Sequence, residues 1–72
     1  MRLYLTFGTT HGALQAERIL KASGIEALIV PKPAAIHGPC GLAVRLREAD
    51  GAPALAALAV AGHEPRQQVR LP

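Results

Sequence analysis

The stretch LAVRLR, residues 42–47, carries the clearest structural signal in the chain. Leucine and valine alternate here with alanine and arginine, a period of two that is typical of a strand with one buried and one solvent-facing side. We therefore predict a strand at these positions. The side chains expected to point into the core are Leu42, Val44 and Leu46.

The residues before this strand predict a loop, a second strand, a helix and a first strand. PKPAAIHGPCG, residues 31–41, holds three prolines and two glycines, which disfavour pairing in a sheet. IEALIVP, residues 25–31, is rich in β-branched and aliphatic residues and ends at a proline, as strands do. Further upstream, Thr9 or Thr10 can cap a helix that Gly24 ends. Residues 2–7 alternate again and predict the first strand.

The residues after LAVRLR predict one more helix and one more strand. Asp50 can cap a helix near Pro53 that closes at Gly62. QQVRL, residues 67–71, is the weaker last strand. The order βαββαβ most simply folds as one ferredoxin-like α+β domain over residues 1–72, a four-stranded antiparallel sheet with both helices on one face. The right-handed crossover rule places the third strand between the first and second.

Length, charge and cysteine content limit the functions available. A chain of 72 residues buries only about 60% of the surface its unfolded form exposes, so a deep substrate cavity is not expected. The net charge of +3 permits an anionic partner without requiring one. A single cysteine excludes an internal disulfide, and no apolar run has the length of a signal peptide or membrane span. We therefore expect a cytoplasmic protein.

The predicted topology gathers three turns at one end of the sheet. These turns are GTTHG, IHGPCG and AGHEP, so we expect Cys40 to lie near His11, His37 and His63 and beside Thr9. A helix N-terminus offers unpaired N–H groups and a partial positive charge, both of which favour a thiolate. The sequence therefore favours a reactive Cys40 on an exposed rim. A buried, inert cysteine is the alternative interpretation.

Three segments of the chain resemble a known family. LTFGTTHGALQAERILKASGI, followed by VPKP and then CGLAVRL, is similar to the short bacterial proteins grouped as "putative selenium/sulfur carrier-like", over about Leu3 to Leu46. The resemblance implies that Cys40 is the attachment point for sulfur or selenium. It implies a carrier protein rather than a stand-alone enzyme, one that accepts a persulfide from a cysteine desulfurase-type donor and passes it to an acceptor protein. No cofactor or metal is implied.

The predicted site is Cys40 with its neighbours in the chain and in the fold. Arg45, and His37 or His11, are expected to hold the persulfide anion or charges of the donor. An outward basic face would help to steer an acidic partner. The supporting residues of the site are Gly41, Arg45, His11, His37, Thr9 and Thr10. The basic face is formed by Arg2, Arg45, Arg47 and Arg70.

Other classes of function stay open at this point. A non-catalytic regulatory or assembly module could form a homodimer through an apolar patch of Leu28 and Val30 on the edge of the sheet. RNA binding to the open sheet face is disfavoured, because only Tyr4 offers an aromatic ring for base stacking. A metal site of Cys40 with two or three histidines fits the expected convergence, but at no recognised ligand spacing.

Overall fold

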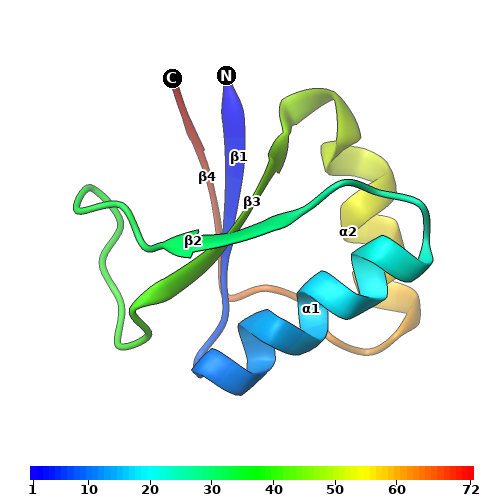
Figure 1. Ribbon diagram of the computed structural model, residues 1–72, viewed down its shortest axis with the longest axis horizontal. Coiled ribbons are helices and arrows are strands. Elements are labelled where there is room, and N and C mark those ends of the chain that lie inside the picture. The colour runs from blue at the N-terminus through cyan, green and yellow to red at the C-terminus, as the bar shows by residue number, and fades with distance from the viewer.

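The computed structural model describes residues 1–72 and shows the predicted ferredoxin-like α+β fold (Figure 1). A four-stranded antiparallel sheet has the order β2-β3-β1-β4, so the third strand lies between the first and second as expected. A single turn of 3-10 helix, η1, precedes the second α-helix. The elements are β1 (Arg2–Thr6), α1 (Thr10–Ala22), β2 (Leu28–Pro31), β3 (Leu42–Arg47), η1 (Glu48–Asp50), α2 (Gly51–Val60) and β4 (Gln67–Leu71).

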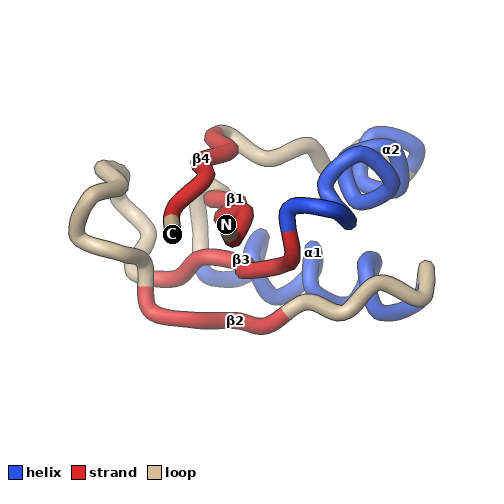
Figure 2. The backbone as a smooth tube through the Cα atoms, turned by 90° about the horizontal axis from the view of Figure 1, so that it is seen from above, coloured by secondary structure: helices blue, strands red, loops and turns tan.

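Both helices cover the same side of the sheet, where the core lies (Figure 2). The register places Leu3 opposite Leu46 and Leu5 opposite Val44, so larger side chains of β1 and β3 meet on this side. The helices contribute a spaced row of small and apolar residues to the same cluster. Those helical residues are Ala13, Ala16, Leu20, Ala54 and Leu58.

Helix α1 begins and ends with the expected caps. The Thr9 side chain accepts a hydrogen bond from the Gly12 N–H at 3.0 Å, which satisfies one of the free donors of the first turn. Ser23 is the C-cap, and Gly24 follows with φ of +78°, the left-handed conformation that glycine adopts most easily. The N-cap at Thr9 fixes where α1 starts, directly after the turn that leaves β1.

Three local predictions are wrong. Strand β2 begins at Leu28 rather than residue 25, because pairing with β3 starts only opposite Arg45, after the chain has crossed from α1 to the sheet. Asp50 makes no cap bond to α2, because its carboxylate accepts hydrogen bonds from Arg47 instead. The apolar pattern of α2 predicts an inward side of Leu55, Leu58 and Ala59. Leu58 is buried and Leu55 packs against the core, but Ala54 is buried in place of Ala59, which is exposed.

No helix of the protein combines the length and the apolar character needed to cross a membrane.

Candidate functional site

Cys40 lies at the end of the loop that connects β2 to β3, residues 32–41, and its side chain is buried. It is only 6% exposed, so the expectation of a thiol on an exposed rim is wrong. The sulfur turns back toward its own chain and accepts a hydrogen bond from the Leu42 N–H at 3.4 Å. A sulfur held in this way is covered by the protein and kept in one place.

The start of α1 lies beside this sulfur, as expected. Thr10 is the first residue of α1, and its Oγ1 lies 3.9 Å from the Cys40 Sγ. Thr9 is occupied by its capping bond to Gly12 and forms no hydrogen bond with Cys40. Two segments 30 residues apart in the chain therefore meet at the thiol.

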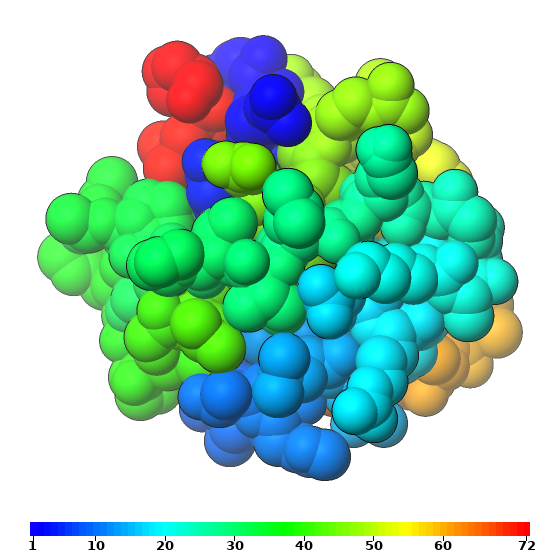
Figure 3. All heavy atoms as spheres, viewed as in Figure 1, coloured from blue at the N-terminus to red at the C-terminus, as the bar shows by residue number.

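Cys40 is part of the wall of a small pocket at this end of the sheet, with a volume of about 250 Å³. The loop 32–41 forms one side of the pocket and bulges from the left flank of the molecule in Figure 3. The ends of β1 and the start of β4 form the other side. The residues that line the pocket are Thr6, Phe7, Lys32, Gly38, Pro39, Cys40, Arg66 and Gln67.

Two basic residues share this pocket with the thiol, and neither was predicted from the sequence. The Lys32 Nζ donates a hydrogen bond to the Gly38 carbonyl, which holds the ammonium group at the loop. The Arg66 guanidinium lies against Gly8, where a Cβ added to the glycine would stand 3.1 Å from Nη1. The three ion pairs of the protein all involve other residues, so Lys32 and Arg66 have no carboxylate partner. The pocket therefore holds two uncompensated positive charges.

A signal for these two cations was present in the sequence. Lys32 opens the loop that ends in Cys40, and Arg66 directly follows the AGHEP turn, which was expected at the same end of the sheet. The topology that places these turns at one end of the sheet therefore also places Lys32 and Arg66 there.

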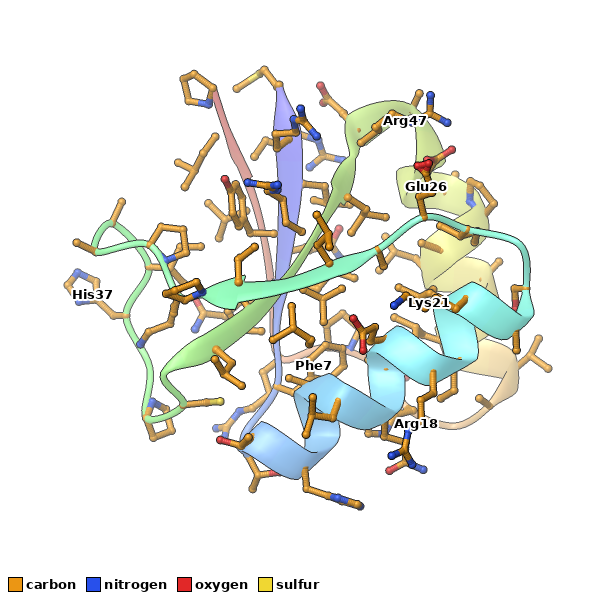
Figure 4. The ribbon with its side chains drawn as sticks, in the orientation of Figure 1. Phe7, Arg18, Lys21, Glu26, His37 and Arg47 are labelled. Atoms are coloured by element: carbon orange, nitrogen blue, oxygen red, sulfur yellow. The ribbon has the colours of Figure 1, made fainter.

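The histidines do not gather around Cys40 as expected. His37 is exposed and uses its backbone carbonyl, which accepts a hydrogen bond from Gln67 Nε2 at 2.6 Å, and Figure 4 shows its ring at the outer edge of the loop. His63 stacks on Phe7 with 5.1 Å between ring centroids, and its Nε2 lies 2.7 Å from the Gly12 carbonyl oxygen. His11 is exposed on α1.

The prediction of converging turns therefore holds for the backbone but not for the histidine rings. No group of three or more His, Cys, Asp or Glu side chains is placed to hold a metal ion. The metal-binding alternative has no ligand set in this fold.

Arg45 lies on the helix-free face of the sheet, away from the thiol pocket. It stands opposite Tyr4 on β1 and Leu28 on β2, and it lines a different pocket of about 530 Å³ together with Arg2 and Arg47. Glu26 and Arg47 also line this larger pocket and lie close together in Figure 4. The hydrogen bond to Asp50, and then the charges of Asp50 and Glu26, raise the pKa of Arg47.

The predicted basic face is correct for three of its four arginines. Arg2, Arg45 and Arg47 share the helix-free face. Arg70 is opposite Leu3 and so belongs to the other face, where it pairs with Glu48 at 2.7 Å. The grouping of Arg70 with the other three is wrong, because β4 pairs with β1 in a register that turns Arg70 toward the helices.

The fold and the site define a small α+β domain with one thiol set in a basic pocket at the end of its sheet. The chain belongs to the family described as "Putative Se/S carrier protein-like", whose model matches residues 2–70. The resemblance seen in the sequence is thereby confirmed. No curated protein and no solved structure matches the chain.

Proposed function

We propose that the protein is a small sulfur or selenium carrier that accepts a persulfide sulfur on Cys40 and passes it to a partner enzyme. The observation that carries this proposal is the pairing of the only thiol with Lys32 and Arg66 in one pocket. A persulfide bears its negative charge on the outer sulfur, and two unpaired cations nearby stabilise that charge. Membership of the carrier-like family supports the same function.

The transfer needs only thiol–disulfide-type chemistry. The Cys40 thiolate attacks the outer sulfur of the donor's persulfide, a new S–S bond forms on Cys40, and the donor leaves as a thiolate. A second thiolate on the acceptor removes the outer sulfur by the same reaction. A cysteine desulfurase-type enzyme is the proposed protein donor, and a sulfur- or selenium-using enzyme is the proposed acceptor. A reducing cytoplasm suits a carrier with one free thiol.

Because the sulfur is only 6% exposed, a protein donor must reach it through the pocket or after the loop 32–41 opens. The loop is held to the rest of the protein by a few hydrogen bonds. The Gln67 side chain on β4 donates to the His37 carbonyl at 2.6 Å, whereas the bond from the Lys32 N–H to the Gly41 carbonyl, at 2.8 Å, joins the two ends of the loop to each other. A partner that binds there and breaks these bonds can expose Cys40, and opening the loop also uncovers Ile36, which is only 3% exposed.

Intact mass spectrometry tests the proposal. The purified protein is incubated with a cysteine desulfurase and cysteine, and Cys40→Ser is treated in parallel. We expect the wild-type protein to gain one sulfur atom that a reductant removes, and the variant to gain none. A wild-type protein that gains no sulfur, and whose folded form resists thiol reagents, would show that Cys40 is a structural residue.

A second candidate function is a non-catalytic assembly module, and exposed Leu28 favours it. This leucine is 53% exposed on β2, an edge strand with one unpaired side. Sedimentation over a range of concentrations separates the two functions. Dimerisation that Leu28→Lys abolishes and Cys40→Ser leaves unchanged, together with no gain of sulfur, would favour the assembly module.

A further inference from the structure

The pocket beside Cys40 has the size and charge of a site for a small anion. Its volume of about 250 Å³ is below the range of about 300–1,000 Å³ found for pockets that bind drug-sized molecules. Lys32 and Arg66 line it without any acidic partner, and no acidic residue is part of the wall. A small anion would therefore find two positive charges and no repelling carboxylate.

An unpartnered hydroxyl in the same pocket independently points to a ligand. Thr6 lines the pocket and is 4% exposed, and its Oγ1 is the one buried side-chain oxygen or nitrogen that has no hydrogen-bond partner in the protein. Buried hydroxyl groups are normally paired, and exceptions need an explanation. A ligand oxygen that accepts a hydrogen bond from the Thr6 hydroxyl would be the missing partner.

We propose that this pocket binds a small sulfur oxyanion whose outer sulfur is transferred to Cys40, with thiosulfate as the representative ligand. Such an anion combines the oxygens that Lys32, Arg66 and Thr6 can bind with a sulfur atom that a thiolate can attack. This inference rests on the proposed carrier function, because it names a class of donor for the same thiol. A small donor also fits a sulfur atom that lies in a pocket rather than on an open surface.

The transfer balances without a further reagent. The Cys40 thiol first loses its proton to solvent, and the thiolate attacks the outer sulfur of thiosulfate. An S–S bond forms on Cys40 while the S–S bond of thiosulfate breaks, and sulfite leaves with the electron pair. One thiolate and one thiosulfate dianion become one persulfide anion and one sulfite dianion, so charge and atoms are conserved.

The test uses the whole chain with thiosulfate as the only sulfur source. The reaction is quenched with iodoacetamide, which alkylates thiol and persulfide alike, and the mass of the protein and the released sulfite are measured. We expect one sulfur on the wild-type protein for each sulfite released, and none on Cys40→Ser. Lys32→Met and Arg66→Met should each slow the transfer about tenfold, the usual size of a lost hydrogen bond to a charged group.

Arg18→Met is the matched control, because Arg18 is an exposed cation on α1, away from the pocket (Figure 4). It should leave the rate unchanged. The alkylation rate of Cys40 by iodoacetamide, a neutral reagent, should be the same in all the cation variants. If Lys32→Met and Arg66→Met slowed both reactions equally, the cations would act on the thiol and not on the anion, which would overturn the inference.

The remaining outcomes separate the inference from the proposed function. Sulfur gained from a desulfurase but not from thiosulfate would overturn the oxyanion donor and leave the carrier function standing. Transfer from thiosulfate at the same rate in the wild-type protein and both cation variants would overturn the role of the pocket. No sulfur gained from either donor would overturn both.

Discussion

At the scale of single residues, Thr6 is the position where the protein gives up stability. It lies on β1 and faces the helix-free side, across from Gln67 on β4, and its buried hydroxyl has no partner. An unsatisfied buried hydroxyl costs about 1–3 kcal/mol of folding free energy. An unpaired hydroxyl lowers the stability of the core, but in a pocket that also contains the only thiol it is free to bind a ligand.

Thr6→Val should therefore stabilise the fold. Valine has nearly the same shape and removes the unpaired hydroxyl, so we expect the free energy of unfolding to rise by about 1 kcal/mol. Urea denaturation followed by circular dichroism measures this change. Val60→Thr is the control, since it exchanges the same two side chains at a position that is 90% exposed and should change stability by less than about 0.5 kcal/mol. A Thr6→Val variant less stable than wild type would mean that the hydroxyl has a partner, such as a bound water.

The burial of Cys40 could not be predicted from residue order alone. A Pro-Cys-Gly sequence is typical of an exposed turn, and what covers the sulfur is its own bond to the Leu42 N–H and its contact with Thr10. The second of these contacts joins parts of the chain that are 30 residues apart. Only the packed structure shows that they close over the thiol.

At the scale of elements, the loop 32–41 decides how the thiol can be reached. Ile36 is 3% exposed and anchors the middle of the loop, while Gly38 beside it has φ of +154°. A Cβ at Gly38 would stand 3.3 Å from Gln67 Nε2, the group that holds the His37 carbonyl. The backbone conformation favours glycine here, and an added Cβ would also press on the Gln67 amide that holds the loop.

Gly38→Ala should loosen this loop. We expect it to lower the free energy of unfolding by about 1 kcal/mol and to speed the labelling of Cys40 by a thiol reagent, which is measured by mass spectrometry over time. Gly41→Ala is the matched control, because nothing lies within 4 Å of the added Cβ and its φ is not positive. Equal labelling rates in the two variants would show that the loop conformation does not control access to the thiol.

Elements were predicted from the sequence where one periodic pattern determines them. Strands β3 and β4 match their predicted ranges, because alternation continues to both ends of each. The start of β2 was missed since pairing there depends on the partner strand. Lys32 lies on the connection from β2 to β3, and Arg66 lies on the connection from α2 to β4. Their shared role depends on how these two connections meet in the fold, which no local sequence pattern predicts.

At the scale of the whole molecule, the core is small, so each buried leucine contributes a large share of the stability of the fold. At about 0.05–0.15 kcal/mol per residue, a chain of 72 residues has a total stability of only about 4–11 kcal/mol. The largest side chains with no exposed surface are Leu3, Leu5, Leu20, Leu58 and Val44. Any one of them is therefore a large fraction of the stability of the fold.

Leu58→Ala should bring the protein close to unfolding. Leu58 is fully buried where α2 joins the core, and removing such a side chain costs about 2–5 kcal/mol through lost burial and the cavity left behind. Val60→Ala in the same helix is the control, since Val60 is 90% exposed and should stay within about 0.5 kcal/mol of wild type. Urea denaturation of both variants gives the comparison. A loss below about 1 kcal/mol for Leu58→Ala would mean that α2 is not packed against the sheet as the structure has it. The position of Arg66 at the thiol pocket would then be wrong as well, because Arg66 lies on the connection that leaves α2 toward β4.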